Sequence, residues 1–122
     1  MKKIFVVDDE KDIREIIADK LKKLNFEVDL ASNGKDALAS IKINPPDLIL
    51  LDVAMPIMDG YETCRKLKED KATEHIPVIF LTGKDLDLQG VLKRSREFGA
   101  AGYISKPSTF EELLGKIKEV LG

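Results

Sequence analysis

The residue types that most often build redox and zinc sites are scarce in this sequence, which has one cysteine, Cys64, and one histidine, His75. A single cysteine excludes an internal disulfide and any metal site built from several cysteines. Without a cluster of histidine and cysteine, the usual ligand set for zinc is also missing. His75 stands in an expected surface loop, and Cys64 lies on the apolar stripe of an expected helix, so neither is favoured as a ligand or nucleophile. The chemistry of this chain is therefore expected to come from other side chains.

Long apolar runs and a strong charge imbalance are absent as well. No run approaches the roughly 20 apolar residues that a membrane-spanning helix needs. Met1-Lys2-Lys3 precedes only four apolar residues, so we expect no secretory signal peptide. The net charge of −2 and the pI near 5.5 give no electrostatic argument for nucleic-acid binding. We expect a cytoplasmic protein that binds neither membrane nor nucleic acid directly.

The chain has 122 residues, of which 43% are hydrophobic and 34% charged, and this suits one compact domain with a single core. Five short apolar runs alternate with five stretches of helical periodicity. The runs, which we expect to be strands, are residues 4–7, 26–30, 48–51, 77–81 and 101–104. This alternation predicts a parallel sheet with right-handed crossovers and helices on both faces. A closed eight-stranded barrel needs about twice this length, so we predict the α/β class: a (βα)5 doubly wound open sheet, flavodoxin-like, of strand order 2-1-3-4-5.

The stretch Leu48–Leu51 is apolar at every position and ends at a carboxylate, Asp52. Such a run indicates a strand that is covered on both faces. In the predicted strand order the first and third strands lie side by side where the order reverses, and open sheets bind ligands at the carboxyl ends of their strands there. The sequence therefore predicts three carboxylates, a hydroxyl and an ammonium group at one edge of the sheet: Asp8, Asp9, Asp52, Thr82 and Lys106.

Carboxylates gathered in one cleft repel each other unless a cation neutralises them. Mg²⁺ is a hard cation that takes oxygen ligands and keeps several waters. A carboxylate beside Mg²⁺ and a lysine is well placed to attack a phosphoryl group, because the cations neutralise the charge on the transferring oxygens. Thr82 has a hydroxyl that can donate a hydrogen bond to such a group.

Several motifs now stand in a defined order along the chain: Asp8-Asp9, Asp52 with Met55-Pro56 and Asp59-Gly60, Thr82, and Lys106-Pro107. This ordered set resembles the receiver domain of bacterial two-component response regulators, and the resemblance spans the whole chain. It implies that Asp52 is the phosphoacceptor, which takes a phosphoryl group from a phosphohistidine. The partner would be a sensor histidine kinase or a histidine phosphotransfer protein.

The same resemblance implies roles for the other residues. Asp9 and Asp52 would bind Mg²⁺, for which Mn²⁺ can substitute, with Asp8 assisting and the backbone carbonyl of Ala54 as a further ligand. Lys106 would contact the phosphoryl group, and its bond to Pro107 is expected to be cis.

Thr82 and Tyr103 are implied as a switch pair. Thr82 would move toward the phosphoryl group, and Tyr103 would turn into the vacated space. This would reshape the face made by the fourth helix, the fifth strand and the fifth helix, where a downstream protein would bind. Ala54 and Lys84 occupy positions that tune the loss of the phosphoryl group. Neither can orient an attacking water, so we predict slow to moderate loss.

Because the sequence ends at Gly122, directly after the last expected helix, we expect residues 1–122 to form a single receiver domain with no output domain, as a monomer or weak dimer. A receiver excised from a larger regulator or hybrid kinase would show the same pattern. The domain would catalyse only its own phosphorylation and dephosphorylation and would not be a turnover enzyme on an external substrate. The main alternative is a receiver-fold interaction module that works without phosphorylation.

Other functions that share parts of this pattern fit less well. A flavin mononucleotide protein needs a Ser/Thr/Gly-rich loop where this chain has an acidic one, and the Walker motif of P-loop NTPases is absent. Haloacid-dehalogenase-like phosphatases carry Asp-x-Asp on the first strand, whereas Asp8 and Asp9 are adjacent.

Two expectations concern the helices. Ser108 is expected to cap the last helix, and Gly90 is expected to make the fourth helix the least stable one.

Overall fold

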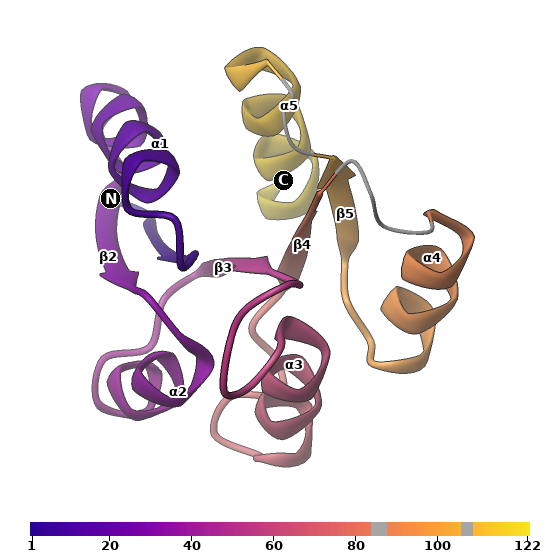
Figure 1. Ribbon diagram of the computed structural model, residues 1–122. Coiled ribbons are helices and arrows are strands. Elements are labelled where there is room, and N and C mark those ends of the chain that lie inside the picture. Colours follow the sequence, from indigo (N-terminus) through magenta and orange to yellow (C-terminus); the bar gives the residue numbers. More distant parts are fainter. Residues whose placement is uncertain (84–87, 106–108) are drawn as a thin grey trace.

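The structure of the protein is a computed structural model that describes residues 1–83, 88–105 and 109–122. Within these ranges five strands and five helices alternate: β1 (Lys3–Val7), α1 (Lys11–Lys23), β2 (Glu27–Ala31), α2 (Gly34–Ile43), β3 (Leu48–Asp52), α3 (Gly60–Glu69), β4 (Val78–Thr82), α4 (Leu88–Glu97), β5 (Gly102–Ser105) and α5 (Phe110–Leu121). The strands form one parallel sheet of order β2-β1-β3-β4-β5, which confirms the predicted fold and topology (Figure 1). Each strand begins and ends within one residue of its predicted bounds.

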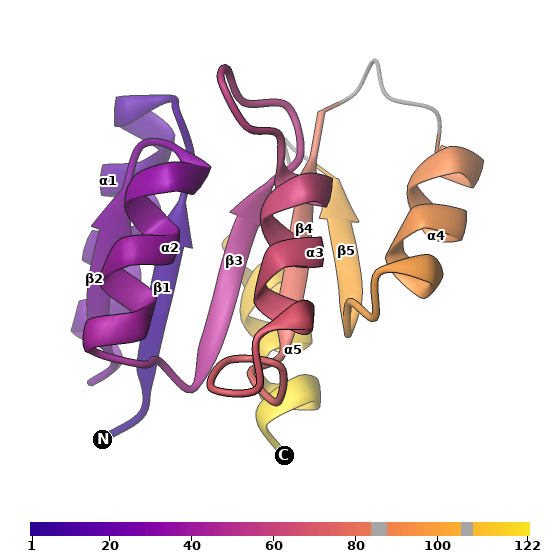
Figure 2. The same cartoon turned by 90° about the horizontal axis from the view of Figure 1, so that it is seen from below.

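Two helical layers cover the sheet, with α1 and α5 on one face and α2, α3 and α4 on the other (Figures 1 and 2). Because successive side chains of a strand point to opposite faces, β1 supplies Ile4 and Val6 to one apolar core and Phe5 and Val7 to the other. All residues of β3 and β4 are buried, which explains why the run Leu48–Leu51 shows no polar alternation. The edge strand β2 is less buried: Glu27 and Leu30 are exposed, and Asp29 is partly exposed.

The bounds of three helices follow from side-chain caps. Asn33, Asp59 and Thr109 precede α2, α3 and α5, and each accepts a hydrogen bond from the backbone N–H three residues later. Such caps satisfy amide groups that have no partner in the first turn of a helix. The predicted cap of α5 at Ser108 is wrong, because Thr109 takes that position, and Ser108 itself lies outside the described residues.

The turn after α4 contains a left-handed glycine. Gly99 has φ +74°, and the Ala100 N–H donates to the Ser95 carbonyl at 2.8 Å. This geometry ends a helix with little strain at glycine, which has no Cβ.

All five strands point toward the same edge of the sheet, as their arrowheads show in Figure 2. The loops that follow β1 and β3 therefore meet at that edge. Among the described residues, none of the helices combines the length and the apolar character that a membrane crossing requires.

Candidate functional site

Among the described residues, two carboxylates are buried, and they lie at the ends of neighbouring strands. Val7 and Leu51 are paired in the register of β1 and β3. Asp8 and Asp52 are the next residues of each chain segment, and their exposed fractions are 0% and 2%. The Asp8 N–H donates to the Ala31 carbonyl at 3.2 Å, which ties this end of β1 to β2. Strand pairing thus holds both carboxylates at the point where the strand order reverses.

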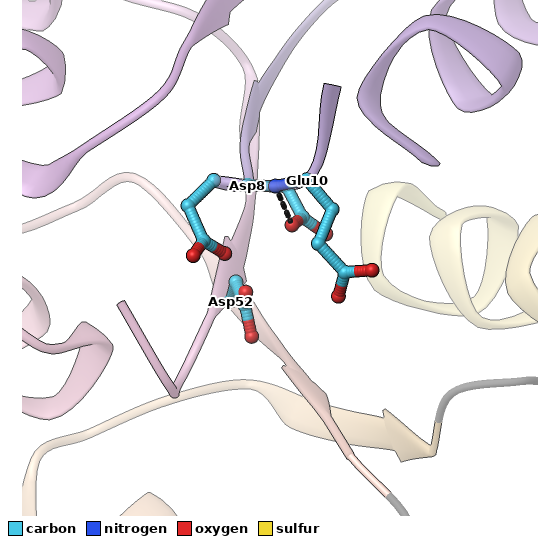
Figure 3. A group of neighbouring side chains, drawn as sticks. Asp8, Glu10 and Asp52 are labelled. Carbon is cyan, nitrogen blue, oxygen red and sulfur yellow. Dashed lines mark hydrogen bonds between the residues drawn. The ribbon is translucent and has the colours of Figure 1, made fainter. Parts of the chain in front are cut away.

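Four acidic residues converge there: Asp8, Asp9, Glu10 and Asp52 each offer a carboxylate oxygen, and these oxygens all lie within 4.8 Å of one another. Figure 3 shows that Asp8 and Glu10 come from the turn after β1 and Asp52 from the end of β3. Asp8 and Asp52 are buried, whereas Asp9 and Glu10 are exposed. The structure brings together all three predicted carboxylates and adds Glu10, to which the sequence analysis gave no role.

This donor set fits Mg²⁺ or Mn²⁺. The four groups are hard oxygen ligands, and no histidine or thiol lies among them. The two exposed carboxylates leave an open side, which suits an ion that keeps several waters. Carboxylates at this spacing would otherwise repel each other, and two of them, Asp8 and Asp52, are buried, so a divalent cation would relieve an electrostatic cost.

The loop from Asp52 to α3 is held close to the end of β3. The Gly60 N–H donates to the Val53 carbonyl at 2.9 Å, and a Cβ on Gly60 would lie 2.3 Å from the Asp52 carbonyl oxygen. The Ala54 N–H donates to Asp52 Oδ1 at 3.3 Å. These contacts fix the backbone on the C-terminal side of Asp52 and orient its carboxylate. The predicted role of the Ala54 carbonyl as a metal ligand stays a prediction.

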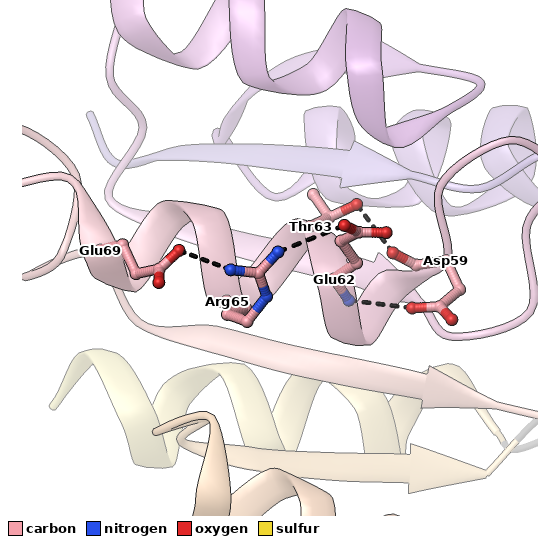
Figure 4. Close-up of polar contacts among 5 residues, drawn as sticks. All are labelled: Asp59, Glu62, Thr63, Arg65 and Glu69. Atoms are coloured by element: carbon pink, nitrogen blue, oxygen red, sulfur yellow. Dashed lines mark hydrogen bonds and ion pairs between the residues drawn. The ribbon is translucent and has the colours of Figure 1, made fainter.

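The first turn of α3 has its own polar network, drawn in Figure 4. Asp59 Oδ1 accepts from the Glu62 N–H at 2.9 Å, and the Thr63 hydroxyl donates to the Asp59 carbonyl at 2.9 Å. Arg65 forms ion pairs with Glu62 at 3.2 Å and Glu69 at 2.8 Å along the exposed side. The N-terminus of α3 is thus capped by Asp59, the residue directly before the helix.

The same loop contains a sharp turn with an exposed apolar tip. Ile57 has φ +71°, and the Met58 N–H donates to the Pro56 carbonyl at 2.7 Å, which together form a γ-turn with a positive central φ. This conformation is rare and strained, above all for a β-branched residue. The side chain of Ile57 is 87% exposed. Local backbone strain is thus concentrated a few residues from Asp52.

Thr82 and Tyr103 lie on adjacent strands, as predicted. Thr82 is the last residue of β4 and is fully buried, and its hydroxyl donates to the Ile104 carbonyl at 3.5 Å. Tyr103 pairs in register with Phe80 and is half-buried against the core under α3 and α4. The predicted site residues Lys84, Lys106 and Pro107 lie outside the described residues.

The other residues that the sequence analysis considered behave as expected. His75 is exposed in a turn. Cys64 is fully buried, and burial raises the pKa of its thiol to about 11, against a smaller lowering by the charge of Lys68. Its thiol donates to the Phe98 carbonyl at 3.6 Å. A buried, protonated thiol of this kind is part of the core and not a nucleophile.

This protein is a doubly wound parallel α/β domain, and its acidic cluster lies where the strand order reverses, the place at which open sheets of this class bind their ligands. The family model of the response regulator receiver domain matches residues 4–118. The chain therefore belongs to the response regulator receiver domain family, which confirms the resemblance found in the sequence, and it is a domain of two-component signalling.

Individual relatives agree with this assignment. The chain is 42% identical to protein PilG of Pseudomonas aeruginosa over 118 residues, which are 95% of this chain and 84% of PilG. Chemotaxis protein CheY4 of Vibrio cholerae superposes with a TM-score of 0.91 at 29% identity and covers 98% of each chain. The receiver domain of a signal transduction histidine kinase from Syntrophus aciditrophicus gives a TM-score of 0.89 at 36% identity, covering 99% of this chain and 90% of that one.

Proposed function

We propose that this receiver accepts a phosphoryl group on Asp52 from the phosphohistidine of a partner protein in a Mg²⁺-dependent reaction. The observation that carries the proposal is the convergence of Asp52 with three further carboxylates within 4.8 Å at the carboxyl end of β3. The donor would be a histidine kinase or a histidine phosphotransfer protein, as expected for the family. The domain would modify itself and would not turn over an external substrate.

In the transfer step, an oxygen of the Asp52 carboxylate forms a bond to phosphorus while the phosphorus–nitrogen bond of the donor breaks. The electron pair stays on the imidazole nitrogen, which takes a proton from solvent. When bound, Mg²⁺ would neutralise negative charge on the carboxylates and on the transferring oxygens. The chain's own part is to hold Asp52 still: β1 and β4 flank β3, and the Ala54 N–H orients the carboxylate. This positioning is the main protein contribution expected for phosphoryl transfer.

The added group would bring roughly one to two negative charges to a buried carboxylate. Thr82 is suited to respond, because its hydroxyl bond to the Ile104 carbonyl is 3.5 Å long and therefore weak. Exchanging that bond for a charge-assisted one to the phosphoryl group would be favourable. It would also release a contact between β4 and β5, the strand that carries Tyr103. We infer that the surface formed by α4, β5 and α5 changes in this way and that a downstream protein reads the change.

Phosphorylation of two asparagine variants tests the proposal. Wild type, Asp52→Asn and Asp47→Asn are incubated with a small phosphodonor such as phosphoramidate, with Mg²⁺ or with EDTA, and the phosphoprotein is separated by phosphate-affinity electrophoresis. Asp47 is a matched control at the opposite end of the same strand, where its carboxylate accepts from the Lys3 N–H at 2.7 Å. Wild type and Asp47→Asn should be labelled only with Mg²⁺, and Asp52→Asn should not be labelled.

Labelling of Asp52→Asn at the wild-type level would show that another residue is the acceptor. If wild type is not labelled and beryllium fluoride with Mg²⁺ leaves its amide spectrum unchanged, the domain is instead an interaction module that works without phosphorylation.

A further inference from the structure

The turn between β1 and α1 carries three of the four clustered carboxylates: Asp8, Asp9 and Glu10. Three successive acidic residues repel one another, and the two exposed ones have solvent on one side. For these side chains to converge with Asp52, something must fix the backbone of the turn. The contacts of Asp8 show what does so.

Three polar groups of Asp8 each have a hydrogen-bond partner: the backbone N–H, one carboxylate oxygen and the backbone carbonyl. Its N–H donates to the Ala31 carbonyl, and its Oδ1 accepts from the Glu10 N–H at 2.9 Å. Its carbonyl oxygen accepts from Nη1 of Arg14 at 2.7 Å. Arg14 lies in the first turn of α1, and its side chain reaches back toward the helix N-terminus, as long helical side chains do.

The Arg14 contact closes a ring of interactions around the turn. The Arg14 N–H donates to the Glu10 carbonyl at 3.0 Å in the first helical bond of α1, while its guanidinium holds the Asp8 carbonyl. The Asp8 carbonyl belongs to the peptide plane that leads into Asp9. Rotation of that plane would swing the Asp9 side chain away from the cluster, and the guanidinium opposes this rotation.

Arg14 can do this without taking part in the cluster itself. Its described contact is to a carbonyl and not to a carboxylate, so the guanidinium itself occupies none of the carboxylate oxygens of the cluster. A guanidinium keeps its charge at any accessible pH and donates in a fixed geometry. Its positive charge also offsets part of the repulsion among the nearby carboxylates.

We propose that Arg14 is a positioning residue that holds the Asp8–Glu10 turn in the geometry in which the cluster binds a divalent cation. The inference deepens the proposed function and rests on it, since it takes the cluster to be the Mg²⁺ site. Groups that orient metal ligands commonly change metal affinity when they are replaced.

The test compares Arg14→Met with Lys11→Met. Lys11 begins α1 next to Glu10 and is exposed, and its side chain makes no hydrogen bond or ion pair with any described residue. Both variants remove one positive charge near the cluster, but only Arg14→Met removes the bond to the Asp8 carbonyl. Mg²⁺ titrations followed by ¹H–¹⁵N NMR give the dissociation constant. The Glu10 amide shift in EDTA reports the geometry of the turn before any metal binds.

Arg14→Met should bind Mg²⁺ on the order of 10-fold more weakly than wild type, and its Glu10 amide should shift in EDTA. Lys11→Met should bind Mg²⁺ as tightly as wild type or more tightly, because removal of a cation favours another cation. Arg14→Lys keeps the charge and one donor, so it should recover part of the affinity and part of the shift. Thermal unfolding in EDTA shows that each variant is folded.

Equal Mg²⁺ affinity in Arg14→Met and wild type would overturn the inference and leave the proposed function standing. Equal weakening in Arg14→Met and Lys11→Met would also overturn it, because the effect would then be one of charge. If wild type binds no Mg²⁺, the proposed function fails, and an unchanged Glu10 amide in Arg14→Met then rejects the positioning role independently.

Discussion

The helices α3 and α4 lie on the same face of the sheet and follow neighbouring strands, yet they are attached to the protein very differently. α3 begins with a side-chain cap at Asp59 and buries five residues, which are Gly60, Tyr61, Thr63, Cys64 and Leu67. Among the side chains of α4 that the structure describes, only Val91 and Ser95 are buried. The Ser95 hydroxyl has no hydrogen-bond partner in the described part of the chain.

This difference in capping and burial indicates which of the two helices is held more firmly against the sheet. α3 continues directly from the loop that holds Asp52, so displacement of this helix would disturb the acceptor. The described side chains of α4 bury less apolar surface than those of α3, and the Ser95 hydroxyl has no described partner; both features lower the free energy needed to detach the helix. We infer that α4 is the element of this pair that responds when the site changes, in agreement with the softness predicted from Gly90.

The two helices meet at an aromatic junction. The Arg94 guanidinium of α4 lies 4.9 Å from the ring centroid of Tyr61 in α3. The Tyr61 ring packs edge-on against Phe80 at 5.2 Å and lies 6.1 Å from Phe98. The Cys64 thiol donates a hydrogen bond to the carbonyl of the same Phe98.

This junction makes Cys64 a natural reporter of α4 detachment. With a pKa of about 11, only on the order of one thiol in a thousand is ionised at pH 8 in the folded protein. Alkylation at pH 8 should therefore proceed through opened molecules, in which the thiol is exposed and its pKa is near 8.5.

The largest expected effect concerns the attachment of α3. Gly60→Ala would place a Cβ 2.3 Å from the Asp52 carbonyl oxygen, so the backbone must shift. We expect a loss of about 3 kcal/mol in the free energy of unfolding, near the upper end for overpacking, together with weaker Mg²⁺ binding. Urea unfolding measures the change in the free energy of unfolding.

Gly115→Ala in α5, where a Cβ meets no atom within 4 Å, is the control. It should stabilise the protein by up to about 1 kcal/mol. Equal effects at the two glycines would mean that α3 is not pressed against Asp52.

An intermediate effect of opposite sign is expected in α4. Ser95→Ala removes a buried hydroxyl without a partner and should raise the free energy of unfolding by about 1 kcal/mol. If α4 opens locally, the rate of Cys64 alkylation should fall about fivefold, the ratio that 1 kcal/mol represents. Ser40→Ala on the exposed side of α2 should change both quantities little. Destabilisation by Ser95→Ala would show that the hydroxyl has a hydrogen-bond partner. Only the smaller buried apolar surface would then distinguish α4 from α3.

The smallest effect concerns the contact between the two helices. Arg94→Met removes the cation over the Tyr61 ring and should cost about 0.5–1 kcal/mol, as expected for an exposed cation–π pair. Alkylation of Cys64 should become a few-fold faster, while amide exchange within α3 stays unchanged. Arg96→Met makes the same charge change on the same helix without a ring contact. Acceleration by both variants alike would assign the effect to charge on α4 and not to the junction.

Much of the fold was predictable because it depends on neighbours in the sequence. The uninterrupted run Leu48–Leu51 indicated a strand buried on both faces. The alternation of strands and helices indicated a doubly wound open sheet, for which 2-1-3-4-5 is a common strand order, and that order places Asp8 beside Asp52. The position of a helix cap was not predictable in this way, because Ser108 and Thr109 are both good capping residues. Only the path of the chain selects Thr109 as the N-cap of α5.

The sequence by itself determined the element order, the residues available at the sheet edge and the family to which the chain belongs. These follow from backbone periodicity and from the solvation of adjacent side chains, which are local properties. The tertiary structure decided that Glu10 joins the cluster, that Arg14 reaches the Asp8 carbonyl, that Ser95 is buried without a described partner, and that Cys64 meets a carbonyl 34 residues away. Such contacts depend on how separate segments pack and on which rotamer fits between them. A pattern of residue types along the chain specifies neither the packing of distant segments nor the rotamer of a side chain between them.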